Sequence, residues 1–270
     1  MAECRRRLDM LLVERGLVSG RDKAKEWIAA GFVRVGGKEV LKPATLLDNS
    51  ALITVKPTRP VFVGRGGEKL ERALEEFQID PNCRFVLDVG ASTGGFTDCL
   101  LRRGAARVYA VDVGTGQLSP ALWADPRVEN KEHTDMRMLP AGALTPPPSL
   151  AVCDVSFISL RLILPSIFLH LTPEGEAVVL VKPQFEAGRG AVGKHGIVRD
   201  RATHLRVLME VLSASENCGF FIAGLLPSPV PGGDGNREYL LWLRKTGESL
   251  RPDLPAVVRA AFDSERSSRT

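Results

Sequence analysis

Residues 85–96, FVLDVGASTGGF, predict the fold of most of this 270-residue chain. The first five form a short apolar run bounded by charge and glycine, which is typical of a buried strand. The loop that follows contains Gly90, Gly94 and Gly95, where a backbone can turn sharply and approach a ligand without interference from a Cβ atom. Phe96 then opens a helix whose free N–H groups face the loop. Strand, loop and helix N-terminus together predict a nucleotide-type site in an open α/β sheet.

The spacing of these glycines favours S-adenosylmethionine over a dinucleotide as the ligand. A dinucleotide fold uses G-x-G-x-x-G to receive a pyrophosphate, and here Ala91 stands where the second glycine is needed. Asp88, at the strand end, would repel a pyrophosphate, whereas its carboxylate suits an amino group and a sulfonium. Methyl transfer is therefore favoured, and hydride transfer with NAD remains the alternative at this point.

Two further acids extend the expected cofactor site. Asp112 ends a second apolar strand about 20 residues after the loop, the position from which a carboxylate can hold ribose hydroxyls. Asp135 follows the next segment, from which it can approach an adenine edge. The residues expected to bind the cofactor are therefore Asp88, Gly90, Ala91, Ser92, Gly94, Gly95, Phe96, Asp112 and Asp135.

Composition places the chain among cytoplasmic globular proteins of about two domains. Apolar residues make up 44% and charged residues 25% of the sequence, which is enough to bury a core. No apolar run approaches the roughly 20 residues that span a bilayer, and the N-terminus lacks the apolar segment of a signal peptide. The five cysteines are scattered without a C-x-x-C pair, so neither a metal site nor a disulfide framework is expected.

Positive charge is concentrated at the start of the chain. Residues 1–60 contain 12 Lys and Arg against 7 Asp and Glu, while the remaining 210 residues contain 24 against 25. This imbalance indicates a polyanionic partner for the first segment, although a solvated basic face would give the same count.

The first segment also has a recognisable pattern. Amphipathic helices are expected over residues 7–16 and 19–31, a hairpin over 32–40 and another strand over 52–55. Residues 5–56 closely resemble the S4-type RNA-binding domain, through R-L-D-x-x-L-V-x-R-G-L followed by G-x-V-x-V-x-G; Gly20 departs from the commoner serine. The resemblance implies that the helices present basic residues to folded RNA, here Arg5, Arg6, Arg7, Arg21, Lys23 and Lys25.

A second domain is expected after a proline- and glycine-rich linker at residues 56–67. We place the boundary near residue 60, which divides the chain into domains 1–60 and 61–270. Apolar strands at 150–154, 177–182, 220–226 and 238–243 alternate with helices at 68–77, 159–170 and 199–218, and glycine-rich residues 185–196 are expected to form a mobile surface loop. The final connection is too short for a crossover helix, so the predicted sheet is mostly parallel with its last strand antiparallel.

Three charged residues should meet at one edge of this sheet. Asp154 and Lys182 each end an apolar strand, and Glu238 begins one that runs in the opposite direction. All three then fall at the carboxyl edge beside the glycine loop, where open α/β sheets bind ligands. Lys69, by contrast, sits on a helix where a solvated position is equally compatible with the pattern.

The second domain resembles the heat-shock-type ribosomal RNA 2′-O-methyltransferases, and the whole chain resembles the TlyA or haemolysin A family. The motifs are RGGEKL (65–70), DVGASTGGFTD (88–98), CDVSFIS (153–159), LVKPQFE (180–186) and GNREY (235–239). The resemblance implies a Rossmann-like domain that uses S-adenosylmethionine to methylate a ribose, of cytidine, in ribosomal RNA of one or both subunits. It implies a catalytic tetrad of Lys69, Asp154, Lys182 and Glu238, adds Phe157 to the cofactor site, and adds Arg65 to the RNA-binding residues.

Two other functions compete with this expectation. An RNA-binding protein with an inactive methyltransferase domain would share both folds, and cofactor binding would distinguish it. A membrane-active haemolysin is disfavoured because the sequence contains no basic amphipathic helix of the kind that lies in a bilayer surface.

Overall fold

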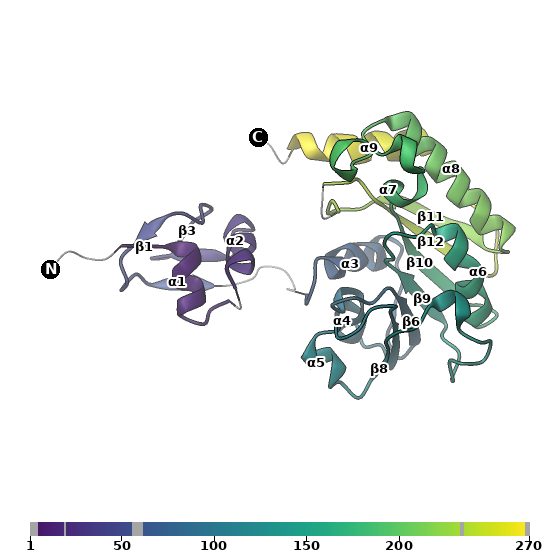
Figure 1. Cartoon of the computed structure of the whole chain (residues 1–270), viewed down its shortest axis with the longest axis horizontal. Helices are drawn as coiled ribbons and strands as arrows, with labels where there is room; N and C mark the ends of the chain where they lie inside the picture. Colours follow the sequence, from purple (N-terminus) through teal and green to yellow (C-terminus); the bar gives the residue numbers. More distant parts are fainter. Residues whose placement is uncertain (1–4, 19, 56–61, 233–234, 268–270) are drawn as a thin grey trace. The chain divides into compact units, whose positions relative to one another are not determined.

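The structure is a computed structural model that describes residues 5–18, 20–55, 62–232 and 235–267. The chain divides into two compact units, Met1–Val61 and Phe62–Thr270 (Figure 1). The predicted helix start at Ser19 and half of the predicted linker, residues 56–61, lie outside the described residues.

The N-terminal unit is a small α+β domain. Two helices pack against a three-stranded antiparallel sheet of order β3-β2-β5, and a two-residue ladder pairs β1 with β4. Leu8, Leu11, Leu12, Ala24, Ile28 and Val33 form its fully buried core. The predicted helices and hairpin are confirmed, whereas β1 and β4 are too short to show in the sequence. The elements are β1 (Arg6–Arg7), α1 (Leu8–Glu14), α2 (Arg21–Ala29), β2 (Val33–Val35), β3 (Lys38–Glu39), β4 (Leu46–Leu47) and β5 (Ile53–Val55).

The C-terminal unit is built on a seven-stranded sheet of order β11-β12-β10-β9-β6-β7-β8. Strand β12 is antiparallel to both of its neighbours, and the remaining pairs are parallel, which confirms the predicted mixed sheet. The strands are β6 (Phe85–Val89), β7 (Arg107–Val111), β8 (Val128–Lys131), β9 (Leu150–Cys153), β10 (Glu176–Val181), β11 (Phe221–Pro227) and β12 (Tyr239–Arg244).

Helices cover both faces of this sheet. Residues of α3, α4 and α5 pack with Val86, Val152 and Val178 on one face, and residues of α6, α8 and α9 pack with Val89, Cys153 and Val179 on the other. The helices are α3 (Gly66–Glu76), α4 (Gly95–Arg102), α5 (Pro120–Trp123), α6 (Leu160–His170), α7 (Pro183–Glu186), α8 (Arg201–Asn217) and α9 (Leu254–Ser267).

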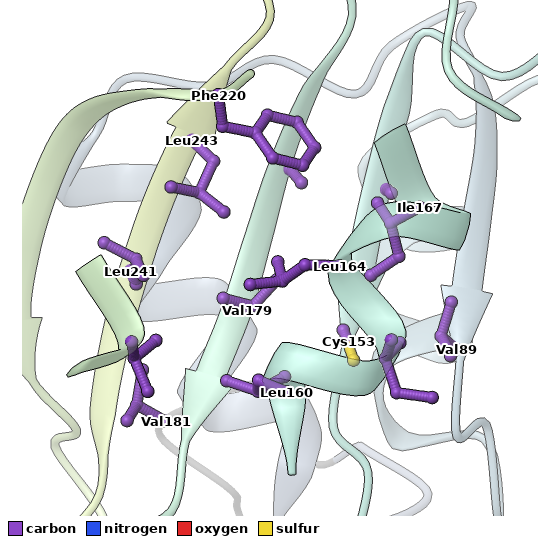
Figure 2. Packing of buried hydrophobic residues seen from close by; sticks show 14 of the residues in the cluster. Val89, Cys153, Leu160, Leu164, Ile167, Val179, Val181, Phe220, Leu241 and Leu243 are labelled. Carbon is purple, nitrogen blue, oxygen red and sulfur yellow. The ribbon is translucent and has the colours of Figure 1, made fainter. Parts of the chain in front are cut away.

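The seven-stranded sheet has a hydrophobic core on each face, because successive side chains along a strand point to opposite faces. Figure 2 shows Leu160, Leu164 and Ile167 of α6 lying over the sheet residues Cys153 and Val179. Central strands β6, β9 and β10 are apolar on both sides because both of their faces are covered. This double covering fixes the positions of the strand ends, where the polar residues gather.

Three features differ from the sequence-based expectation. Residues 185–196, expected to form a mobile surface loop, contain the end of α7 and two 3₁₀ turns, Arg189–Ala191 and Lys194–Gly196. The buried side chain of Asn236 accepts from Val198 N and donates to Gly196 O, which ties this segment to the start of β12. Strand β8 and helix α9 were not predicted.

Candidate active site

Four strands bring their ends to one edge of the sheet. Asp88 pairs with Val152 and Ala110, so β6, β7 and β9 end side by side. The residues that directly follow these three strands are Gly90, Asp112 and Asp154. Strand β10 adds Lys182. Because Val181 pairs with Tyr239 of the antiparallel β12, Glu238 arrives at the same edge from the opposite direction. The structure therefore brings together the three strand-end residues that the sequence predicted there.

The glycine loop after β6 is closely packed. Gly90 has φ +81°, and a Cβ atom there would lie 3.0 Å from the carbonyl oxygen of Asp154. Gly94 has φ +95°, and a Cβ atom there would come within 2.2 Å of Leu122. Side chains at these positions would strain the backbone or collide with neighbours, so the loop requires glycine at both.

A cleft of about 530 Å³ opens between this loop and the ends of β6, β7 and β9. This volume lies within the range of small-molecule and cofactor sites. Of the residues predicted to bind the cofactor, it is lined by Gly90, Ser92, Asp112, Asp135 and Phe157.

The two predicted acids on this cleft already have partners. The Asp112 carboxylate accepts from Ser92 N at 2.8 Å and Gly114 N at 2.7 Å, which fixes its orientation. The Asp135 carboxylate accepts from the backbone and guanidinium of Arg137, with Nη2 at 2.6 Å, and these bonds hold the pKa of Asp135 below its usual range. Each carboxylate keeps lone pairs for a further donor.

Asp88 lies behind the loop rather than among the residues lining the cleft. Its side chain is fully buried; Oδ2 accepts from Thr97 Oγ1 at 2.6 Å, and Oδ1 has no hydrogen-bond partner among the described residues. Burial disfavours the ionised form and raises the pKa of Asp88 to about 7. The expected contact between this carboxylate and a cationic ligand therefore remains a prediction.

The raised pKa makes stability depend on pH at this one residue. Below about pH 4 both the folded and the unfolded chain carry a protonated Asp88, so there is no penalty. Between about pH 4 and 7 only the unfolded chain ionises, so folding stability falls as pH rises, by on the order of 4 kcal/mol in total. We expect Asp88→Asn to remove this loss. Urea unfolding at pH 5 and pH 8 measures the loss of stability in the wild type and in Asp88→Asn. Asp80→Asn is the control, because Asp80 is exposed. An equal pH dependence in the wild type and in Asp88→Asn would contradict the prediction.

A second cleft, of about 260 Å³, adjoins the first on the side of α3 and α4. Gly90, Ser92, Asp154 and Ser156 line both clefts. The remaining predicted site residues on the second cleft are Arg65, Lys69, Ala91, Gly95, Phe96 and Lys182.

Two ion pairs stand at this second cleft. Lys69 Nζ lies 2.5 Å from Glu238 Oε2, and both side chains are almost fully buried. Lys182 Nζ lies 2.6 Å from Asp154 Oδ1, in a close ion pair rather than an aligned hydrogen bond, and donates to Ser156 Oγ at 2.9 Å. Lys69 is therefore buried and paired instead of solvated on its helix.

Sequence reasoning left out three polar residues that contact the predicted ones. Ser156 contacts Lys182, Thr97 contacts Asp88, and Gln184 donates to Glu238 Oε1 at 3.3 Å. All three lie inside motifs that the sequence singled out. Ser156 and Gln184 are each two residues from a charged site residue, which was the available signal, whereas Thr97 is nine residues from Asp88.

The predicted RNA-binding residues of the N-terminal unit lie at or near its surface. Ion pairs are made by Arg5, Arg6, Arg7, Arg21 and Lys25, and Lys23 lies over the ring of Trp27, 5.9 Å from its centroid. Arg6 contacts Glu14, and Lys25 contacts Asp22. Arg7 and Arg21 both contact Asp9, whose side chain is fully buried. The exposed pairs are weak and open to competition by a phosphate, whereas the buried Asp9 holds its two arginines in place.

Two known protein families match this chain, one in each of its two structural units. The sequence pattern of FtsJ-like methyltransferases matches residues 62–245, and that of the S4 domain matches residues 6–53. The first match covers more than half of the chain. The chain belongs to the FtsJ-like methyltransferase family.

Relatives of this FtsJ-like chain include a protein of Mycobacterium tuberculosis named 16S/23S rRNA (cytidine-2′-O)-methyltransferase TlyA, which is 46% identical over 89% of the chain and 90% of the relative. A candidate rRNA methyltransferase of Bacillus subtilis is 49% identical over 92% of the chain and 89% of the relative. A solved structure of a candidate hemolysin from Streptococcus thermophilus superposes with a TM-score of 0.76, at 40% identity and 99% coverage of both chains. The resemblance to the TlyA or haemolysin A family is confirmed.

Within the described part of this FtsJ-like chain, no cluster of three or more His, Cys, Asp or Glu side chains has the arrangement of a metal site. None of the described helices combines the length and apolarity needed to cross a membrane.

Proposed function

We propose that this FtsJ-like protein transfers a methyl group from S-adenosylmethionine to a ribose 2′-hydroxyl, of a cytidine, in ribosomal RNA in the cytoplasm. One observation carries the proposal: the cleft with Lys69, Asp154 and Lys182 shares a wall with the nucleotide-sized cleft beside the glycine loop. The names of the rRNA cytidine-2′-O-methyltransferase relatives support the choice of substrate.

The larger cleft fits S-adenosylmethionine by its chemistry. The oriented carboxylate of Asp112 suits ribose hydroxyls, and Asp135 suits an exocyclic amino group. Gly90 leaves room where a Cβ atom would fill the passage toward Asp154. When bound, the cofactor supplies an electrophilic methyl group on a positively charged sulfur.

Lys182 is proposed to act as the general base that accepts the proton of the ribose hydroxyl. In its neutral form its lone pair would accept the 2′-hydroxyl proton while the hydroxyl oxygen takes the methyl group, which a bound cofactor would supply from its sulfonium sulfur. Asp154, 2.6 Å from Lys182 Nζ, orients the amine and stabilises it once it carries the proton. A carboxylate fixed beside a developing ammonium, at a site partly shielded from water, lowers the energy of the transition state more than it would in water.

Lys69 and Glu238 are proposed to hold the ribose against Lys182. Their pair leaves Lys69 Nζ with further N–H groups at the cleft that contains Asp154 and Lys182. Arg65, exposed at the mouth of this cleft, suits a phosphate next to the target ribose. Orientation of this kind supplies much of the rate of a bimolecular transfer.

The N-terminal unit, residues 1–60, is proposed to act as the RNA-binding domain and residues 61–270 as the catalytic domain. Arg7 donates to buried Asp9 through Nε at 3.0 Å and Nη2 at 2.9 Å, so the opposite edge of its guanidinium faces outward. Arg21 Nη2 lies 3.4 Å from the same carboxylate. Two guanidinium groups fixed side by side on one anchor form a preorganised fork for an RNA phosphate.

We expect the salt dependence of RNA binding to report this fork. Arg7→Gln and Arg21→Gln should each weaken binding to ribosomal RNA and lower the slope of log affinity against log salt by about 0.7–0.9, one phosphate contact each. Arg15→Gln is the matched control, because Arg15 donates to the backbone carbonyls of Asn49 and Ala51. Filter binding between 50 and 300 mM salt measures the slopes; equal slopes in all four proteins would argue against the fork.

The proposed reaction is tested by incubating the protein with ribosomal subunits and methyl-labelled S-adenosylmethionine. Label that remains in an alkali-resistant dinucleotide containing cytidine supports the proposal. Label on a base would replace it by a base methyltransferase. If neither labelling nor cofactor binding by calorimetry is detected while RNA binding persists, the protein is an RNA-binding module with an inactive second domain.

A further inference from the structure

We propose that Ser156 is a positioning residue for the reaction, which fixes the direction of the Lys182 lone pair. The inference rests on the proposed function. Ser156 lies outside the Lys69, Asp154, Lys182 and Glu238 set, and its observed contact is a hydrogen bond that its hydroxyl accepts from Lys182 Nζ at 2.9 Å.

The geometry of a neutral amine explains why a second anchor matters. Lysine carries its amine on a flexible four-carbon stem, so one ion pair leaves the amine free to rotate. A neutral amine has two N–H groups and one lone pair. Ser156 accepts one of these hydrogens; when the second turns toward the Asp154 carboxylate, 2.6 Å away in the ion pair, the lone pair is left for the ribose hydroxyl.

Ser156 is also in the right place for this task. It lines both clefts, as Asp154 does, and therefore lies where the methyl donor and the ribose must meet. Lys182 is 8% exposed, so its side chain is largely enclosed by protein where Ser156 meets its amine.

The loop that carries Ser156 is tied to the segment that carries Lys182. The ring of Phe157 packs against that of Phe185, with centroids 5.0 Å apart. Glu186 accepts from Ser159 Oγ at 2.6 Å and from Leu160 N at 2.7 Å. Phe157 itself has φ +63°, an uncommon conformation for an aromatic residue, although the residue is 91% exposed. The hydroxyl and the amine therefore keep a fixed relation.

We expect Ser156→Ala to lower kcat for methyl transfer by about 10- to 100-fold, the scale of a misplacement of about 1 Å, with the KM for RNA within about threefold of wild type. Ser156→Thr restores a hydroxyl and should recover most of kcat. Ser249→Ala is the matched control; Ser249 lies outside both clefts, its hydroxyl accepts from Ile222 N at 3.1 Å, and its loss should leave kcat within about threefold of wild type.

A double-mutant cycle separates positioning from a general loss of structure. If Ser156 acts through Lys182, adding Ser156→Ala to Lys182→Met causes no further loss of the residual rate, and the S-adenosylmethionine affinity by calorimetry is unchanged in every variant. A wild-type rate in Ser156→Ala, additive losses, or failure of Ser156→Thr to recover would overturn the inference. Absence of methyl transfer in the wild type would instead overturn the proposed function.

Discussion

Replacing Lys182 by methionine should reduce methyl transfer to ribosomal RNA by about 10²- to 10⁴-fold, the usual contribution of a positioned general base. Methionine keeps an unbranched apolar side chain along the buried path but offers no amine. Asp154 then loses its partner, yet its side chain is 21% exposed and borders two open clefts, so water can solvate the carboxylate. The folded structure should therefore survive the substitution.

Single-turnover labelling of ribosomal subunits, with protein in excess over RNA, measures this loss. Calorimetric titration with S-adenosylmethionine should give the same affinity as wild type within about threefold, because the cofactor is proposed to occupy the larger cleft, which Lys182 does not line. Lys245→Met is a control for loss of a half-buried lysine amine outside both clefts, since Lys245 donates to the carbonyls of Phe168 and Leu171. Methylation by Lys182→Met at the wild-type rate would remove Lys182 from the chemistry.

The strand-end residues were predictable because parallel strands in one sheet share a direction. Asp154 and Lys182 each follow a buried apolar run, so topology alone brings them to one edge. Glu238 required one further step, the short connection that makes β12 antiparallel. The strand order and directions alone therefore place these three residues close together.

Lys69 was not predictable from helix periodicity. Its partner Glu238 is 169 residues away in the sequence, and α3 gives no sign that one of its charged positions points into the protein. Only the resemblance to a known family suggested Lys69. A contact of this sequence separation follows from packing, which the helix pattern does not encode.

Other differences come from packing that local patterns do not show. Strand β8 has the sequence VENK and lies at the edge of the sheet beside β7, so it lacks the apolar run of the central strands. Residues 185–196 contain many glycines, yet the side chain of Asn236 donates to Gly196 O and accepts from Val198 N, which ties the end of this segment to the rest of the domain. The burial of Asp88 changes its pKa, and burial depends on helices α3 and α4 that the strand sequence does not specify.

Breaking the buried pair between Lys69 and Glu238 should destabilise the protein by about 3–5 kcal/mol, because removal of one partner leaves the other as an uncompensated charge. Lys69→Met would leave Glu238, 3% exposed, with a single 3.3 Å hydrogen bond from Gln184. The double variant Lys69→Met with Glu238→Gln removes both charges and should recover most of this stability. Methyl transfer should be lost in both, because neither retains the ammonium proposed to hold the ribose.

An exposed pair on the same helix provides the control. Arg72 contacts Glu76 at 2.7 Å one turn away, with side chains 52% and 43% exposed, so Arg72→Met should cost about 0.3–0.5 kcal/mol and leave activity intact. Urea unfolding of the four variant and wild-type proteins measures the comparison. If Lys69→Met were as stable as Arg72→Met, the pair would contribute nothing through burial. If instead the double variant were stable and still methylated RNA, Lys69 and Glu238 would have a structural role only, and Lys182 with Asp154 would suffice for the chemistry.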